Sequence, residues 1–435
     1  MSHCSASLDE GGSQQPAPNL DFDSAGHLYA THALHAFAAR CPPQLVRWAI
    51  ERYSAPRDVV LDPMCGSGTT LVEAGLCGRA PWGADIDPLA RLLAQVKSTL
   101  LEPSLILAAA AEVEVRLSEP NLDASWRPDL PGLSRWFRAD VAADLARLRL
   151  AIQGTTVGDD VRRLLWVLYS SLIVARTSVA NARDLAHSRH HYRAWETAPD
   201  VGGRFLSQTR RAARLMGEYQ QRLTASGYPA PQPLLVGSDA RDLAIPPGSV
   251  GMIFTSPPYC TALDYTRAHS FSVAWLADVL ATSSDDYRTL ARRYIGSERA
   301  PMAEANLTQP LPPTSGHPLV DAAVTALSDH PKRAWIVARY FRDMAAVLKE
   351  CARVLKSGGH AVLVVCPSNI RKVRIPTHEV FAALAPAVTD GALQLVALHE
   401  RTIHDRRRVM PYLEAAFGER MRTEYVLVLR RGPLS

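Results

Sequence analysis

Two short stretches contain residue types that could bind a ligand and take part in a group-transfer reaction. In the first, LDPMCGSGTT (61–70), an apolar run comes before Gly66 and Gly68, and a helical pattern comes after them. Glycines there permit a tight turn against a ligand, and the following helix start presents free amides. The second, TSPPY (255–259), follows the apolar run VGMIF. Because proline donates no ladder hydrogen bond, it ends a strand and stiffens a turn that carries a hydroxyl and an aromatic ring.

The glycine loop lacks the residues that two common nucleotide loops require. A P-loop ends in Gly-Lys-Ser/Thr, and a dinucleotide fingerprint needs a third glycine where Leu71 stands. Asp62, at the strand end, would repel a pyrophosphate and suit an ammonium group. Asp85 follows the next strand, where a carboxylate usually binds ribose hydroxyls, although Asp87 competes for that role. A ligand with an amino acid at one end and a ribose at the other matches S-adenosylmethionine. The alternative is an ordinary strand–helix connection.

The elements around these stretches predict an α/β chain interrupted by helices. Strand and helix patterns alternate over residues 57–100, as in a parallel βαβ unit, and strands return from residue 231 onward. Residues 101–230 have helical periodicity and almost no strand signal, which predicts a mainly helical insertion. Residues 282–330 contain many loop-forming residues and predict a surface excursion or lid. RAWIVARYFRDMAAVLKECARVLKSG predicts a helix that a glycine stops.

The composition describes an ordinary folded protein in a reducing compartment. Of 435 residues, 47% are hydrophobic and 21% charged, and the net charge of +5 comes mostly from arginine, which mildly favours a nucleic-acid partner. The seven cysteines have no CxxC spacing, so we expect neither a disulfide framework nor a metal site, and a cytoplasmic location. Residues 1–26 predict a disordered tail rather than a signal peptide, and no apolar run reaches the ~18 residues that a membrane span needs.

Taken together, the motifs resemble those of the S-adenosylmethionine-dependent DNA amino-methyltransferases, which methylate adenine at N6 or cytosine at N4. DPMCGSGTTLVEA resembles the first motif of the family, and TSPPY resembles its catalytic motif of Ser, Asn or Asp followed by Pro-Pro and an aromatic residue. THALHAFAARCPPQLV resembles the segment that closes over the methionine end, although Phe37 and Ala38 stand where many relatives have Tyr-Pro. GSDARDL (237–243) resembles the motif whose aspartate, here Asp239, meets the cofactor's adenine.

The resemblance implies a Rossmann-like methyltransferase fold, with a mixed seven-stranded sheet, helices on both faces and a mainly helical insertion. The core would comprise residues 27–100, its cofactor half, and 231–435, its catalytic half. Target recognition would lie in the insertion, at 101–230. The cofactor residues that the resemblance implies are Thr31, His35, Asp62, Pro63, Cys65, Gly66, Ser67, Gly68, Thr69, Thr70, Asp85, Ile86, Asp239 and Ala240.

The chemistry of amine methylation explains the catalytic turn. The lone pair of an exocyclic amine is delocalised into its base, so an enzyme must align the nitrogen and accept hydrogen bonds from it. The Ser256 hydroxyl and the Pro257 carbonyl would be those acceptors, and Pro258 would help to fix their direction. Tyr259 would stack on a base extruded from the duplex. A covalent cysteine mechanism is disfavoured, because the family with that mechanism has a Pro-Cys pair and here the order is reversed, as in Cys41-Pro42.

The identity of the target base rests on the resemblance alone. A serine in the catalytic motif is typical of the cytosine-N4 branch, so we expect N4-methylation of cytosine in double-stranded DNA, with N6-adenine methylation as the alternative. An RNA or protein-glutamine methyltransferase would usually have Asn or Asp at that position. A non-catalytic DNA-binding subunit is a further alternative. A cognate restriction or defence system is the partner, besides DNA, that a DNA methyltransferase could have. Candidate substrate contacts, which could instead belong to solvated helix ends, are Asp264, Tyr265, Arg267, Arg183 and Arg189.

Overall fold

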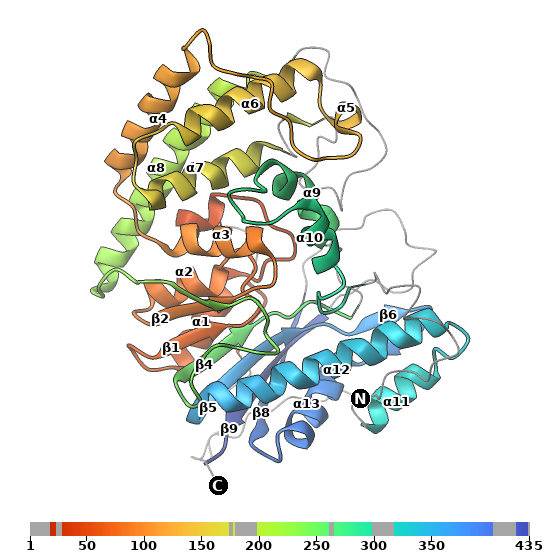
Figure 1. The fold of residues 1–435 in the computed structure, drawn as a ribbon. Coiled ribbons are helices and arrows are strands. Elements are labelled where there is room, and N and C mark those ends of the chain that lie inside the picture. The colour runs from red at the N-terminus through yellow and green to blue at the C-terminus, as the bar shows by residue number, and fades with distance from the viewer. Residues whose placement is uncertain are drawn as a thin grey trace.

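A seven-stranded mixed sheet forms the centre of the protein, in the order β3-β2-β1-β4-β5-β9-β8 (Figure 1). In this computed structural model the described residues are 18–22, 28–173, 177–178, 198–260, 265–297, 317–402 and 423–433. Neighbours from β3 to β5 pair in parallel, and β9 runs antiparallel to both β5 and β8. The strands are β1 (Val59–Asp62), β2 (Ala80–Ala84), β3 (Leu234–Gly237), β4 (Val250–Thr255), β5 (Leu355–Val365), β8 (Leu393–Thr402) and β9 (Thr423–Arg431). The predicted mixed sheet of a Rossmann-like methyltransferase is confirmed.

Helices cover both faces of this sheet, which explains why the central strands are apolar along their whole length. Alternate residues of β5 point to opposite faces: Val362 and Val364 pack with α1 (Pro43–Tyr53), and Leu363 packs on the opposite face. That opposite face is covered by α12 (Pro331–Val354) and α13 (Thr377–Val388). All six residues of β4 are buried, so the turn that follows β4 starts from a fixed support.

The helical insertion packs as a bundle of helices against α2 and α3, which lie between it and the sheet (Figure 1). Its core is continuous with apolar side chains of helices in the α/β part, including Val72 of α2, Leu93 of α3 and Trp275 of α9. The insertion is therefore joined to the core by a shared hydrophobic cluster. The helices concerned are α2 (Thr69–Leu76), α3 (Pro88–Ser98), α4 (Pro103–Leu117), α5 (Leu133–Trp136), α6 (Ala139–Gln153), α7 (Asp159–Leu172), α8 (Val201–Ser226) and α9 (Tyr265–Trp275).

Three local predictions were wrong in detail. The long helix α12 ends at Val354 and not at the glycine pair, because β5 begins at once and Leu355 pairs with Val250 of β4. The described parts of the stretch 282–330, which are 282–297 and 317–330, contain two helices, α10 (Ser284–Leu290) and α11 (Pro318–Thr325), and a capping box between Ser283 and Asp286 starts the first. A hairpin of β6 (Ser368–Ile370) and β7 (Val373–Ile375) was not predicted. Within the described part of the chain, no helix is long and apolar enough to cross a membrane.

Candidate active site

One cavity lies where four parallel strands end, and it contains most of the predicted cofactor residues together with the catalytic serine. Ligands of open α/β sheets bind at this edge. Gly68, Thr31 and His35 are not among the residues that line it. The predicted residues that do are Asp62, Pro63, Cys65, Gly66, Ser67, Thr69, Thr70, Asp85, Ile86, Asp239 and Ala240, with Ser256, Pro258 and Tyr265.

The glycine loop is held by the two carboxylates that flank it. Thr70 Oγ1 donates to Asp62 Oδ2 at 2.6 Å, and the Met64 amide donates to Asp62 Oδ1 at 3.1 Å. The Gly66 amide donates to Asp85 Oδ2 at 2.8 Å, which ties the loop after β1 to the end of β2. Gly68, which has φ +83°, packs so closely on α3 that an added Cβ would lie 2.6 Å from the Ala94 Cα. Gly68 therefore allows close helix packing, and Gly66 shapes the cavity.

Burial controls the charge of these two carboxylates. Removal from water raises the pKa of Asp62 to about 6, although the Thr70 hydrogen bond offsets part of the effect. Burial also raises the pKa of Asp85 to about 7, and the charge of nearby Asp87 adds to the increase. Both groups would be more readily ionised beside a cation. This end of the cavity thus suits a positively charged ligand group.

Asp87, which competed with Asp85 for the ribose-binding role, is used inside the protein. Its Oδ1 accepts the Leu89 amide at 2.8 Å as the N-cap of α3. Its Oδ2 accepts hydrogen bonds from His269 Nδ1 at 2.6 Å and from the Tyr287 hydroxyl at 3.1 Å. Burial would raise the pKa of Asp87, but the charge and hydrogen bond of His269 outweigh it and the pKa is lowered. Asp85 is therefore the carboxylate with capacity for a ligand.

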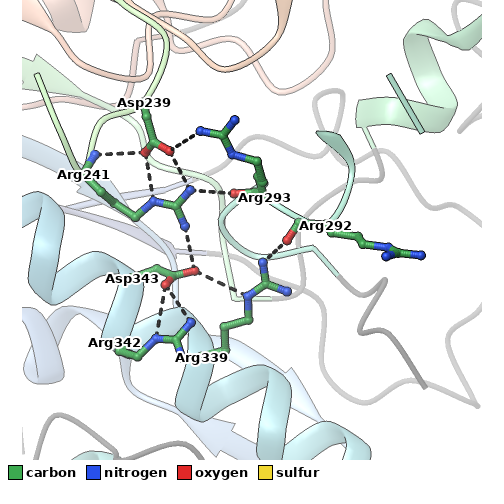
Figure 2. Close-up of polar contacts among 7 residues, drawn as sticks. All are labelled: Asp239, Arg241, Arg292, Arg293, Arg339, Arg342 and Asp343. Atoms are coloured by element: carbon green, nitrogen blue, oxygen red, sulfur yellow. Dashed lines mark hydrogen bonds and ion pairs between the residues drawn. The ribbon is translucent and has the colours of Figure 1, made fainter. Parts of the chain in front are cut away.

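Asp239, at the end of β3, lies in an arginine-rich network (Figure 2). Arg241 donates to it with Nε and Nη2, each at 2.8 Å, and Arg293 Nη2 lies 3.2 Å from its Oδ2. Arg241 Nη1 also reaches Asp343 Oδ2 on α12 at 3.2 Å. Burial alone would raise the pKa of Asp239, but the hydrogen bonds and charge of Arg241 lower it. Asp239 is thus a fixed anion on the cavity wall.

The catalytic turn follows β4, next to the glycine loop that follows β1. Ser256 and Pro258 line the cavity, Pro257 is buried, and Tyr259 is half-buried outside the lining. The Tyr259 hydroxyl donates to Glu424 Oε1 on β9 at 2.7 Å, and Glu424 Oε2 lies 3.0 Å from the buried Arg401 Nη1. The turn is thereby anchored to two strands of the sheet.

The segment before α1 is fastened by a buried carboxylate, Glu73 of α2. The Tyr29 hydroxyl donates to Glu73 at 2.5 Å, His32 Nε2 lies 2.8 Å from it, and Arg47 Nε donates at 2.8 Å. Burial would raise the pKa of Glu73, but these partners lower it. Thr31 is buried in the 3-10 helix Ala30–Ala33 of this segment.

His35, in the same segment, contacts the insertion and not the cavity. Its Nε2 lies 3.1 Å from Ser170 Oγ on α7, and burial lowers its pKa to about 3. His35 is therefore neutral at physiological pH. The geometry gives it a role in joining the two parts of the protein.

An aromatic pair lies on the wall opposite the sheet. Phe37 and Tyr265 line the cavity with their ring centroids 6.0 Å apart, and the Phe37 ring covers Gly66. Arg267, the other predicted substrate contact on α9, is exposed to solvent. The remaining three, Asp264, Arg183 and Arg189, lie outside the described residues.

Sequence reasoning missed the residues that follow α10. Arg293, Tyr294 and Ile295 line the cavity, although their stretch was read as a loop excursion. The sequence ARRYIG, with paired arginines and an aromatic residue, was the available signal. Arg40 and Arg241 also line the cavity and were not proposed.

Comparisons with known proteins agree with this geometry. Residues 15–95 match the family described as DNA methylase. The chain is 25% identical over 394 residues to the Type II methyltransferase M.MvaI of Kocuria varians, covering 84% of this chain and 83% of that one. It is 36% identical over 85 residues to the Type II methyltransferase M.MjaII of Methanocaldococcus jannaschii, covering 18% of this chain and 16% of the other. The chain is thus similar to Type II methyltransferases over most of its length, and its segment 15–95 is similar to the DNA methylase family.

Among solved structures, the rRNA methyltransferase aviRa from Streptomyces viridochromogenes has a TM-score of 0.33 and 13% identity, covering 94% of this chain and 93% of the other. The strand order of the sheet identifies the fold as that of a Rossmann-like methyltransferase. No group of three or more His, Cys, Asp or Glu side chains that could hold a metal ion occurs in the described ranges.

The cofactor of the protein is S-adenosylmethionine, and the cavity fits it. Asp62 ends β1, and Asp85 and Asp239 follow β2 and β3; these three strands are adjacent and spaced about 5 Å apart. The ligand has three donor groups in a row: an ammonium, ribose hydroxyls and a purine amine. Asp62 would hold the first, Asp85 the second and Asp239 the third. The bound group supplies a methyl on a positively charged sulfur.

Proposed function

We propose that this DNA methyltransferase modifies the exocyclic amine of a base, and that the base is cytosine, methylated at N4. The observation that carries the proposal is the shared cavity of Ser256 and the cofactor residues Asp62, Gly66 and Asp85. Ser256 Oγ would accept a hydrogen bond from the amine and so return electron density to its nitrogen. The Pro257 carbonyl would accept a second. As the nitrogen–methyl bond forms, the sulfur–methyl bond of the donor would break, and one amine proton would pass to solvent.

Tyr259 supports this turn in a way that differs from the stacking role expected of it. Its hydroxyl bond to Glu424 fixes the aromatic ring beside the turn. We keep base stacking by Tyr259 as a proposal. Tyr265 and Phe37, which line the cavity, are then available to enclose the same extruded base.

The decisive experiment identifies the methylated product. The protein is incubated with labelled cofactor and with genomic DNA, total RNA or a protein extract, and the products are digested and separated by mass spectrometry. N4-methylcytosine in DNA is the expected result. N6-methyladenine would overturn the choice of base, and label confined to RNA or protein would overturn the proposal itself.

A pair of serines at opposite ends of β4 tests the acceptor. Ser256→Ala should lower the methylation rate by at least about 100-fold, the effect of removing one such group from a reaction centre, with cofactor affinity nearly unchanged. Ser249→Ala is the matched control, because Ser249 precedes the strand and its hydroxyl donates to the Pro246 carbonyl. Full activity of the first variant would show that Ser256 is not the acceptor.

Three further assignments belong to the same proposal. We expect the insertion to contribute to recognition of the DNA sequence, the protein to act in the cytoplasm, and a restriction or defence partner to accompany it. None of the six described cysteines forms a disulfide, which agrees with a reducing compartment. Sequencing that maps modified bases in a host expressing the protein would identify the recognised sequence.

A further inference from the structure

Asp239 has no acceptor position left for a ligand. A carboxylate offers about four lone-pair positions. On Oδ1, two are used by the Arg241 amide at 3.1 Å and Nε at 2.8 Å. On Oδ2, Arg241 Nη2 donates at 2.8 Å and Arg293 Nη2 at 3.2 Å. A purine amine that donates to this carboxylate therefore has to replace one of these four donors.

Arg293 is the donor that can leave most easily. Its bond to Asp239 is the longest of the four, and its side chain is 59% exposed, compared with 21% for Arg241. Arg241 is also held from its other side by Asp343, as Figure 2 shows. Because both residues line the cavity, the released position faces the ligand.

Departure of the Arg293 side chain leaves its backbone in place. Arg241 Nη2 donates to the Arg293 carbonyl at 3.0 Å, and Arg339 Nη2 donates to the carbonyl of Arg292. These bonds join the segment after α10 to β3 and α12 without the guanidinium of Arg293. Replacement of the Arg293 guanidinium by a purine amine at Asp239 therefore needs only a rotation of the Arg293 side chain.

We propose that Arg293 is an internal competitor for the purine-binding carboxylate: it occupies the acceptor position on Asp239 that a purine amine needs, and binding of such a purine displaces it. A ligand with that amine takes over the acceptor position that Arg293 gives up. A ligand with a carbonyl there has no proton to donate, so it does not displace Arg293 from Asp239. The inference rests on the cofactor-binding part of the proposed function and is independent of the methylated base.

The test compares two ligands that differ in this one group. S-Adenosylhomocysteine has the amine, and S-inosylhomocysteine has a carbonyl in its place. With Arg293→Met, the dissociation constant for the first should fall about two- to fivefold, the range for loss of an exposed ion pair. The dissociation constant for the second should not change. Isothermal titration calorimetry without DNA measures both.

Two further variants isolate the effect. Arg292→Met removes the same charge from the neighbouring residue, whose guanidinium points away from Asp239, and should alter neither constant (Figure 2). In an Asp239→Asn background, Arg293→Met should give no tightening, because the contested carboxylate is absent.

The outcomes separate this proposal from the proposed function. Equal or weaker binding of S-adenosylhomocysteine by Arg293→Met would overturn the proposal, and so would equal tightening of both ligands. The predicted pattern in a protein that fails to methylate DNA would support the proposal and overturn the proposed function. If the unmodified protein bound neither ligand, the cofactor assignment and this proposal would both be overturned.

Discussion

The two ends of the cofactor cavity satisfy their carboxylates in different ways. Asp62 and Asp85 accept hydrogen bonds from neutral hydroxyl and amide groups, and burial raises their pKa values to about 6 and about 7. Asp239 is bound by two arginines, and its pKa is lowered. The end with Asp62 and Asp85 thus has no positive charge from the protein, and a ligand can supply one. At the other end, the arginines already balance the charge of Asp239.

This difference indicates where the binding energy of the cofactor is concentrated. A ligand ammonium beside Asp62 would meet a desolvated carboxylate and gain most of the available electrostatic attraction. A purine amine beside Asp239 would replace an existing donor, so its net gain would be only the difference between two hydrogen bonds. We expect affinity to depend mainly on the first end and selectivity on the second.

The largest effect on cofactor affinity is expected from a substitution of Asp62. Asp62→Asn keeps the side-chain volume and removes the charge, so the dissociation constant for S-adenosylhomocysteine should rise roughly 10- to 100-fold, the value of a charged hydrogen bond. Asp239→Asn should raise it less than about fivefold. Calorimetry measures both, with the exposed Asp242→Asn as the control. A greater loss from Asp239→Asn would contradict the comparison.

A pH series is expected to have the next largest effect. The cofactor ammonium would bind ionised Asp62, and its ribose hydroxyls would donate to ionised Asp85. Binding therefore releases protons, and affinity rises with pH through the pKa values of about 6 and about 7. The dissociation constant should fall roughly tenfold between pH 5.5 and pH 8. In Asp62→Asn the pH dependence should be smaller. A constant affinity across the series would show that these groups do not titrate in the free protein.

The same raised pKa values make the protein without ligand less stable as the pH rises, whereas they make cofactor binding stronger. Because the folded chain holds these protons more tightly than the unfolded chain, the two carboxyls contribute less to the free energy of unfolding as the pH rises from about 4 to about 7. Saturating S-adenosylhomocysteine should therefore raise the melting temperature more at pH 8 than at pH 6. Differential scanning fluorimetry tests this, with Asp62→Asn expected to reduce the difference.

The smallest effect on affinity is expected behind the Asp239 end. Asp343→Asn removes an anion that contacts Arg241, Arg339 and Arg342, while Arg241 keeps its two short bonds to Asp239 (Figure 2). Affinity should change less than about twofold, and the free energy of unfolding should fall by about 1–3 kcal/mol. The exposed Asp329→Asn is the control for denaturant unfolding. Loss of affinity would show that Asp343 helps to position Asp239.

The comparison also explains what the sequence could and could not predict. Asp62, Gly66 and Asp85 lie within one strand–helix–strand unit, so their spacing alone placed them at one sheet edge. Arg293 comes from a separate segment and reaches Asp239 only in the folded protein. The partner of Tyr259, Glu424, is likewise distant in the sequence, and its strand pairing was needed to find it. The predicted end of α12 was wrong for the same reason: the helix ends where β5 begins to pair with β4, which is distant in the sequence.

The adjacency of β1 and β4 has a consequence for redesign. The donor and acceptor halves of the reaction centre are joined by sheet pairing, so the helices α4 to α8 between them in the chain could be exchanged for those of a relative. Such a graft would have to reproduce the apolar faces that meet Val72, Leu93 and Trp275, because the insertion shares one core with them. Where the insertion reads the DNA sequence, as proposed above, such a graft would change the sequence preference and leave the reaction centre unaltered.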